Sequence, residues 1–210
     1  MHPLLFATTN PHKVRELAAV LGPLGYEVRS LDSLSAVPPE PVEDADSFAG
    51  NARLKAIGYA RATGLECLAE DSGLEVDALG GAPGVHSARY SGTDGSREDR
   101  DRANNDKLLH ALSAVPVERR TARFVCAMCL ARPDGTIVAE ARGTYEGRIA
   151  DAPRGENGFG YDPLFFLPDV GRTSAELSPK EKDARSHRGR AARLLAETLA
   201  QLGRASRSRI

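Results

Sequence analysis

The chain has 210 residues, of which 41% are apolar and 27% are charged, and its formal net charge at neutral pH is −1. This composition is typical of soluble globular proteins, and the near-zero charge gives no general attraction for nucleic acid or a membrane surface. At this length the chain suits a single domain over residues 1–210. Because no apolar run reaches the length of a signal peptide or a membrane span, we expect a cytoplasmic protein.

The N-terminal part predicts alternating strands and helices, from apolar runs, helical spacing and capping residues. In chain order we expect a strand at 4–7, a polar loop at 8–10, a helix that Gly22 and Pro23 end, a strand at 28–31, an acidic loop at 35–46, and a helix that Ser47 caps and that runs to about Thr63.

The remainder predicts further strands, a hairpin and a C-terminal helix. In chain order we expect a strand at 65–69, an apolar segment at 74–79, a helix at 98–112, hairpin strands at 124–131 and 136–142, strands at 144–149 and 164–167, a capping box at 178–181, and a final helix that buries Leu194, Leu195, Leu199 and Leu202. Such a mixture of helices and hairpins predicts an α/β domain around a mixed sheet.

The three cysteines do not form a disulfide framework. Cys126 and Cys129 make a CxxC motif, but they lie in a predicted strand, where positions three apart point to opposite faces. We therefore expect two small buried thiols rather than a metal or redox pair.

The segment Thr8–Lys13, TTNPHK, follows a strand and begins a helix. The N-terminus of a helix carries partial positive charge and suits an anion, and Lys13 adds a full charge in the first turn. This is not a Walker loop, because GxxxxGK[ST] is absent. The alternative is an ordinary helix cap with a solvated lysine.

Three acidic residues are candidates for a metal site. Glu70 and Asp71 follow the apolar run 67–69, and we expect Ser72 and Gly73 to form a turn that presents Asp71. Mg²⁺ takes one or two carboxylates plus substrate phosphates, and Glu43 in the acidic loop could complete the set. The alternative is that these acids are ordinary surface residues.

Two further groups suit a nucleotide. Asn51 and Lys55 lie four apart, hence on one helix face, where Lys55 could neutralise phosphate, pair with the acids or simply be solvated. The run FGYDP at 159–163 offers aromatic faces for a base, although a core turn would use the same residues. Additional donors for phosphate or a base carbonyl are Lys182, His187 and Arg188.

These motifs, in this order and spacing, resemble the inosine triphosphate pyrophosphatase family in its bacterial dITP/XTP pyrophosphatase branch. The resemblance spans nearly the whole chain. The matching segments are ATTNPHKVREL at 7–17, SFAGNARLKA at 47–56, AEDSGLEVDALGGAPGVHSARYSG at 69–92, GFGYDPLF at 158–165 and LSPKEKDARSHRGRA at 177–191.

The resemblance implies hydrolysis of ITP, dITP and XTP to the monophosphate and pyrophosphate, a house-cleaning activity that keeps non-standard purines out of DNA and RNA. It also implies an elongated mixed α/β sheet flanked by helices, two lobes around a central cleft, and a homodimer without nucleic-acid or membrane partners.

The resemblance also assigns roles to individual residues. Asp71 would be the general base and, with Glu43 and Glu70, a Mg²⁺ ligand. The residues expected to bind substrate are Thr8, Thr9, Asn10, Pro11, His12 and Lys13 at the triphosphate, Ser72, and, at the base or phosphate, Phe159, Gly160, Tyr161, Asp162, Lys182, His187 and Arg188. Asn51 and Lys55 would have substrate or structural roles.

The chain departs from the family pattern at two positions. Gly50 stands where the family has an acid, which removes that carboxylate and lowers helix propensity by up to about 1 kcal/mol. Glu70 replaces an aspartate that is usual in the bacterial branch, so its carboxylate reaches one methylene further than the aspartate would.

Two alternatives remain open. One is a nucleotide pyrophosphatase of different base preference, such as the Maf-like group. The other is a nucleic-acid-binding module that uses the arginines of 185–209, including Arg204, Arg207 and Arg209. Steeply salt-dependent binding to RNA or DNA would support the second alternative.

Overall fold

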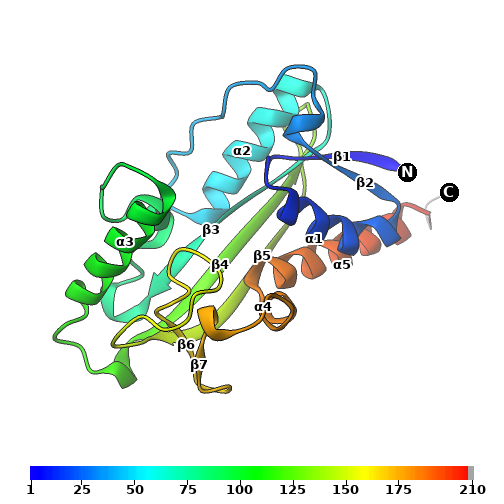
Figure 1. The fold of residues 1–210 in the computed structure, drawn as a ribbon. Helices are drawn as coiled ribbons and strands as arrows, with labels where there is room; N and C mark the ends of the chain where they lie inside the picture. The colour runs from blue at the N-terminus through cyan, green and yellow to red at the C-terminus, as the bar shows by residue number, and fades with distance from the viewer. Residues whose placement is uncertain (208–210) are drawn as a thin grey trace. The chain divides into compact units, whose positions relative to one another are not determined.

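The computed structural model describes residues 1–207, and residues 208–210 lie outside the description, among them Arg209. The strands are β1 (His2–Phe6), β2 (Tyr26–Ser30), β3 (Cys67–Val76), β4 (Thr121–Ala131), β5 (Ile137–Ile149), β6 (Phe165–Leu167) and β7 (Arg172–Thr173). The α-helices are α1 (Pro11–Leu21), α2 (Phe48–Thr63), α3 (Arg97–Ala111), α4 (Pro179–Arg185) and α5 (His187–Arg207) (Figure 1).

The strands form one mixed sheet in the order β2-β1-β3-β4-β5-β6-β7. β1 pairs in parallel with β2 and with β3, and Phe6 is aligned with Ser30 and Leu68. β5 and β6 are antiparallel, with Ile149 opposite Phe165, and β7 continues antiparallel to β6. The expected mixed α/β fold is therefore confirmed.

The chain is divided into two compact units. Unit 1 comprises residues 1–71, 126–143 and 188–210, and unit 2 comprises residues 72–125 and 144–187. The strands β3, β4 and β5 each contribute residues to both units.

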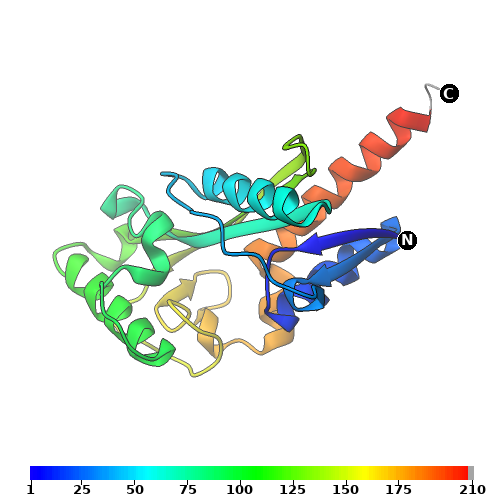
Figure 2. The ribbon, with the colours of Figure 1, turned by 90° about the horizontal axis from the view of Figure 1, so that it is seen from above.

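The core of unit 1 forms where α1 and α5 pack on one face of its strands. Leu17 and Leu21 of α1 and Leu195 and Leu199 of α5 share a cluster with Met128 of β4 and with residues of the neighbouring strands. Helix α2 covers the opposite face (Figure 2). Its buried apolar residues include Phe48, Ala52, Ala56 and Tyr59.

The core of unit 2 forms between α3 and the strand ends in that unit. Leu108 and Leu112, at the C-terminal end of α3, cluster with Leu74, Tyr161 and Phe165, among other residues. Phe165 also contacts Phe124 and Tyr145, with ring centroids 4.5 and 5.4 Å apart respectively. This core holds the C-terminal half of α3 against the strands, whereas the N-terminal half of this helix carries mostly polar residues.

The expected turn at Ser72 and Gly73 is wrong, because β3 runs without interruption from Cys67 to Val76. Gly73 serves close packing instead of a turn. A Cβ at this position would lie 2.4 Å from the Ser87 Oγ, which also accepts a hydrogen bond from the Leu74 N–H at 2.8 Å. Glu70 and Asp71 are therefore presented from the middle of a strand.

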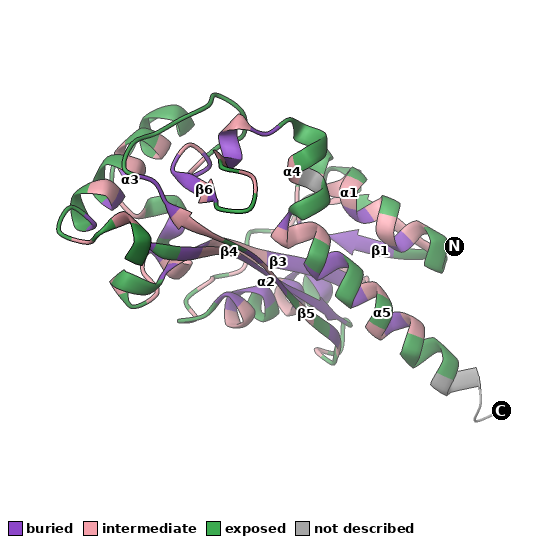
Figure 3. Ribbon diagram, turned by 90° about the horizontal axis from the view of Figure 1, so that it is seen from below, coloured by how far each residue is buried: buried purple, intermediate pink, exposed green. Residues whose placement is uncertain are grey.

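The C-terminal helix also differs from its prediction. Leu195 and Leu199 are buried, but Leu194 and Leu202 are 41% and 45% exposed, and alanines at 191 and 192 complete the buried stripe. Figure 3 shows this alternation of buried and exposed residues along α5. The prediction is therefore confirmed for Leu195 and Leu199 and wrong for Leu194 and Leu202, because Ala191 and Ala192 share the buried face with the first two leucines.

The strands expected at 136–142 and 144–149 are one continuous strand, β5, while the following local predictions are confirmed. Ser178 and Glu181 form the predicted capping box at the start of α4. Cys67, Cys126 and Cys129 are free and buried. Among the described helices, none combines the length and the apolar character that crossing a membrane requires.

Candidate functional site

Parallel pairing in unit 1 brings the loop after β1 to the acidic part of β3. The Ala7 N–H donates to the Leu68 carbonyl at 2.8 Å, so the chain at Thr8 leaves the sheet close to Glu70. The carboxyl ends of parallel strands share one edge of a sheet, and ligands of α/β proteins bind at such edges. The loop after β1 and the acidic part of β3, which are more than fifty residues apart in the chain, thus meet at the predicted anion site.

The segment Thr8–Lys13 is built around the start of α1. Asn10 is the N-cap, its Oδ1 accepting from the His12 N–H at 2.9 Å, and Pro11 occupies the first helical position. The Thr8 Oγ1 accepts from the Asn10 N–H at 3.1 Å. Both hydrogen bonds stabilise the start of α1, so Thr8 and Asn10 act as capping residues, whether or not this helix end also binds an anion.

Glu70 is buried at the centre of a charged cluster in unit 1. The Lys13 Nζ lies 2.8 Å from Oε1, and the Arg188 Nε donates to both carboxylate oxygens at 2.9 Å. Arg188 also lies 3.7 Å from Glu16. The cluster therefore joins α1, β3 and the first turn of α5 through one carboxylate.

Burial alone would raise the pKa of Glu70, but the charges of Arg188 and Lys13 outweigh it and lower this pKa to about 2. Burial likewise lowers the pKa of Arg188, and Glu70 more than offsets this, so that the pKa is raised. Both groups are therefore ionised across the physiological range. The nearby Cys126 thiol, 3.6 Å from Glu70, has its pKa raised by burial and by the same carboxylate, so it is a neutral packing residue.

Asp71 of β3 and Glu43 of the acidic loop each contact a side chain on the same face of α2. The buried Asn51 donates from Nδ2 to Asp71 at 3.1 Å, while its Oδ1 accepts from the Ala45 N–H at 3.0 Å. One turn further, the Lys55 Nζ lies 2.7 Å from Glu43. Lys55 therefore pairs with an acid, which is one of the roles expected for it. Asn51 connects the acidic loop to β3 through its two hydrogen bonds.

A cavity of about 410 Å³ opens among these groups within unit 1. Its polar lining includes Thr8, Thr9, Lys13, Lys55 and Glu70, and the acidic loop closes one side. Glu40 from that loop also lines it and lies 3.0 Å from the Lys55 Nζ. Burial lowers the pKa of Lys55, but Glu43 and Glu40 raise it overall, so Lys55 brings positive charge to the cavity.

In unit 2 the loop 158–162 is held firmly by polar contacts. The Asp162 carboxylate is buried and accepts from the Phe159 N–H at 2.8 Å and from Lys182. The Asp101 carboxylate accepts from the Gly160 N–H at 2.8 Å, and Asn105 donates to the Gly160 carbonyl at 3.0 Å. Two residues one turn apart on α3 thus fix this loop.

The aromatic residues of this loop differ in exposure. Phe159 is 54% exposed, whereas Tyr161 is 4% exposed and donates its hydroxyl to the Ser87 carbonyl at 2.8 Å. The ring of Phe159 is therefore accessible to solvent, while Tyr161 anchors the loop in the core. The Arg97 guanidinium lies 4.4 Å from the Phe159 ring centroid and the Lys182 ammonium 5.1 Å.

The remaining predicted residues divide between the units. Ser72 continues β3 into unit 2, and His187 in unit 2 stacks on Phe124 with the ring centroids 5.3 Å apart. Sequence reasoning did not single out Glu40 or Arg97. Glu40 stood in the acidic loop already noted, whereas the charged run 97–102 gives no sign of which arginine faces Phe159.

The surroundings of Glu43, Glu70 and Asp71 decide which of these carboxylates could bind Mg²⁺. The described residues contain no group of three histidine, cysteine, aspartate or glutamate side chains that could enclose a metal. Both oxygens of Glu70 already contact cations. Asp71 and Glu43 offer carboxylate oxygens on one face of α2, which suits an ion that takes one or two carboxylates and completes its shell with substrate phosphates.

Comparison with protein families gives a match over most of the chain. A family model described as the Ham1 family matches residues 4–198. A dITP/XTP pyrophosphatase of Anaeromyxobacter dehalogenans is 48% identical, covering 96% of this chain and 98% of the relative. Another, from an Exiguobacterium species, is 53% identical, covering 91% of this chain and 94% of the relative.

Solved structures agree with these matches. A Ham1 protein from Coxiella burnetii has a TM-score of 0.86 at 39% identity, covering 96% of this chain and all of that chain. A nucleoside-triphosphatase, also described as a dITP/XTP pyrophosphatase, from Mycobacterium abscessus has a TM-score of 0.77 at 47% identity, covering 92% of this chain and 97% of that chain.

Proposed function

We propose, since the chain belongs to the Ham1 family, that it hydrolyses non-standard purine nucleoside triphosphates to the monophosphate and pyrophosphate. ITP, dITP and XTP are its substrates, and its action removes them from the nucleotide pool. The observation that carries this proposal is the family match together with the cavity that Thr8, Lys13 and Lys55 line at the carboxyl edge of the sheet.

The triphosphate is assigned to the unit 1 cavity. Lys13 and Lys55 supply positive charge there, and Thr8 and Thr9 supply hydroxyl groups beside the start of α1. Both lysines are paired with carboxylates in the described structure, Lys13 with Glu70 and Lys55 with Glu43. Phosphate oxygens would compete for these ammonium groups, which offset the charge that develops on the leaving pyrophosphate.

Asp71 is assigned the general-base role. It orients a water molecule and takes its proton as the water oxygen attacks the α-phosphorus. The bond from that phosphorus to the bridging oxygen then breaks and pyrophosphate leaves. Asn51 donates to one Asp71 oxygen and so holds the carboxylate in place. An aspartate with an ordinary pKa near ~3.9 is a weak base, so positioning supplies much of the effect.

We also propose that the reaction depends on Mg²⁺ held by Asp71 and Glu43. Bound there, the ion would neutralise phosphate charge and make water more acidic. The third ligand role, that of Glu70, stays a prediction. It requires that a contact with Lys13 or Arg188 be exchanged, because these cations occupy both carboxylate oxygens.

The base is assigned to the exposed ring of Phe159 in unit 2, with donors around it. A donor that meets the 6-oxygen of hypoxanthine or xanthine would face the amino group of adenine. Each buried polar group left unpaired costs about 1–3 kcal/mol, so one or two mismatches reject ATP a hundredfold.

The test is pyrophosphate release from ITP, dITP, XTP, GTP and ATP, with and without Mg²⁺. Wild type is compared with Asp71→Asn and with the control Asp106→Asn, which changes an exposed aspartate of α3. We expect metal-dependent turnover of the first three substrates and a loss of at least about 100-fold in kcat in Asp71→Asn alone.

The outcomes separate the parts of the proposal. Equal turnover of ATP would remove the base selection and leave the phosphate chemistry. Full activity of Asp71→Asn would remove the general base. No turnover of any triphosphate would overturn the proposed function.

Two finer expectations come from the family resemblance. We propose that the protein acts in the cytoplasm and that it is a homodimer. Sedimentation equilibrium at several protein concentrations tests the second point, and a mass equal to that of one 22.4 kDa chain throughout would contradict it.

A further inference from the structure

Arg97 occupies a position that helix stability does not explain. It is the first residue of α3, directly after the N-cap Ser96. Cations near the N-terminus of a helix oppose its dipole, whereas Glu98 and Asp99 in the same turn complement it. Arg97 is therefore at the end of α3 where a positive charge is least favourable for the helix.

The side chain of Arg97 lies over an exposed aromatic ring instead. Its guanidinium carbon is 4.4 Å from the Phe159 centroid, and the loop that carries Phe159 is fixed by Asp101, Asn105 and Asp162. A half-exposed ring on a fixed loop is a stacking surface, and a guanidinium that moves from over this ring to its rim when a base stacks there would present hydrogen-bond donors to that base.

The two cations beside Phe159 differ in what else they contact. Lys182 pairs with the buried carboxylate of Asp162, so its ammonium is committed to the loop. Arg97 approaches Asp101 at 3.9 Å, and its side chain is 58% exposed. Such an exposed pair contributes little, so the guanidinium can turn toward a ligand at small cost.

The donor geometry of arginine matches one edge of a 6-keto purine. Hypoxanthine and xanthine present two neighbouring acceptors there, O6 and N7, which is the pattern that arginine binds with two hydrogen bonds in guanine. Adenine replaces O6 with an amino group, which is a donor and would face the donors of Arg97.

We propose that Arg97 is a base-selecting residue, whose guanidinium donates to O6 and N7 of a 6-keto purine stacked on Phe159. This inference rests on the proposed function, because it names a specificity contact for the same substrate class. It assigns to α3 a part in base recognition beyond the role of Asp101 and Asn105 in holding the loop.

The test measures kcat and KM for ITP and ATP in wild type, Arg97→Ala, Arg97→Lys and the control Arg102→Ala. Arg102 is an exposed arginine on another face of α3. We expect Arg97→Ala to raise the KM for ITP and to lower the ITP-to-ATP ratio of kcat/KM by about tenfold, with kcat for ITP nearly unchanged. Arg97→Lys keeps the charge without the paired donors and should restore little of the selectivity.

Binding of IMP and AMP by calorimetry accompanies the kinetics, and thermal melting confirms that each variant is folded. If wild type hydrolyses ITP but Arg97→Ala keeps the wild-type ratio, the inference about Arg97 is overturned and the proposed function stands. If wild type neither hydrolyses ITP nor binds IMP more tightly than AMP, both are overturned. A fall in selectivity that Arg102→Ala shares would also refute a specific role for Arg97.

Discussion

Glu70 shows how one residue can join several segments of unit 1. Its carboxylate is buried and contacts Lys13 from the start of α1 and Arg188 from the start of α5. An ion pair of this kind gains little over an apolar replacement, because desolvation opposes the attraction. Removing only one partner of the pair is costly, however, because the other charge then stays buried without that partner.

The substitution Glu70→Gln should lower the free energy of unfolding by about 3–5 kcal/mol, because the largely buried Arg188 loses its closest carboxylate and keeps only the longer contact with Glu16. The control is Glu27→Gln, which removes an exposed carboxylate 2.9 Å from Arg29 and should cost less than about 1 kcal/mol. Urea unfolding of both variants measures the difference. Equal effects of the two substitutions would show that the Glu70 cluster does not stabilise the fold.

The sequence could identify Glu70 as an unusual residue but not its partners. An acid directly after a buried apolar run must be exposed, paired or bound to a cation, and the structure has it paired. Arg188 lies 118 positions away in the chain, and no local pattern links the two. For Asp71 the expected turn was wrong, and Gly73 is explained by its close contact with Ser87.

At the scale of elements, the acidic loop is fitted to α2 through glycines. A Cβ on Gly50 would lie 2.5 Å from the Ala45 Cβ, and one on Gly58 would lie 2.5 Å from the ring of Pro41. The loop therefore approaches the helix where side chains are missing, and this brings Glu43 to Lys55. This close approach explains why a glycine occupies position 50. The sequence alone had indicated only that an acid is missing there and that the helix propensity is lower.

Gly50→Ala should destabilise the protein by about 1–2 kcal/mol, because displacement of the loop outweighs the better helix propensity of alanine. The matched substitution is Gly203→Ala in α5, where a Cβ would meet nothing within 4 Å. It should be neutral or stabilise by up to about 1 kcal/mol. Thermal melting followed by circular dichroism compares them, and a melting temperature of Gly50→Ala at or above wild type would refute the packing argument.

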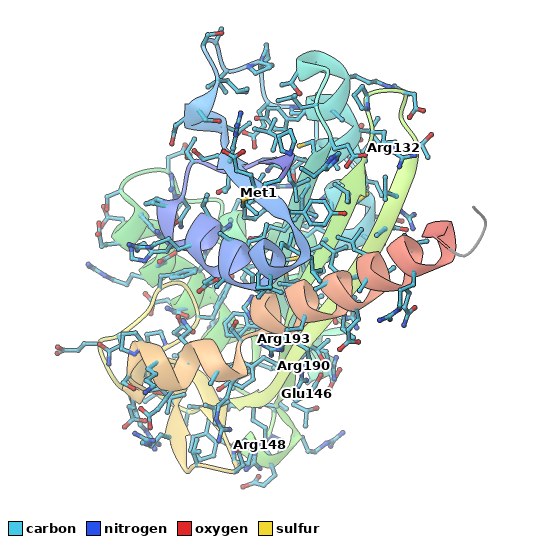
Figure 4. All side chains as sticks on the ribbon, turned by 90° about the vertical axis from the view of Figure 1, so that its right-hand side faces the viewer. Met1, Arg132, Glu146, Arg148, Arg190 and Arg193 are labelled. Atoms are coloured by element: carbon cyan, nitrogen blue, oxygen red, sulfur yellow. The ribbon has the colours of Figure 1, made fainter. Side chains whose placement is uncertain are left out.

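Helix α5 shows where pattern analysis succeeds and where it fails. Its amphipathic character was predicted, and Arg190 and Arg193 project from its exposed side (Figure 4). The predicted stripe was right for Leu195 and Leu199, but Ala191 and Ala192 complete it, and Leu194 is exposed. The apolar periodicity predicts the buried face of a helix to within about one residue. The space between the helix and the sheet then decides whether a small or a large side chain is buried at each position.

For the whole molecule, the sequence predicted most elements and the fold class. Helix limits came from caps such as Asn10 and Ser47, which act through bonds to the next few residues. What it did not predict depends on contacts across the chain: the uninterrupted β3, the pairing of Glu70, and the position of Arg97 beside Phe159. The predicted substrate residues and the Mg²⁺ site stay predictions until the activity measurements are made.

The stability of the molecule should depend on pH through Glu70. Its pKa is lowered from an ordinary 4.5 to about 2 in the folded protein, because the charges of Arg188 and Lys13 outweigh burial. A carboxyl group of this kind adds stability that is fully present above its unfolded pKa and is lost as the pH falls through the folded pKa. A shift of this size corresponds to about 3 kcal/mol.

We therefore expect the free energy of unfolding of wild type to fall steadily from about pH 5 toward pH 2, since the unfolded chain takes up a proton at Glu70 before the folded protein does. Glutamine at this position cannot titrate, so Glu70→Gln should lose less stability over the same range. The measurement is urea unfolding of both proteins at pH 7, 5, 4 and 3. The exposed acids with lowered pKa values, such as Asp77 and Glu181, titrate alike in both proteins and cancel in the difference. A gap between wild type and variant that stays constant down to pH 3 would mean that Arg188 and Lys13 do not hold Glu70 ionised.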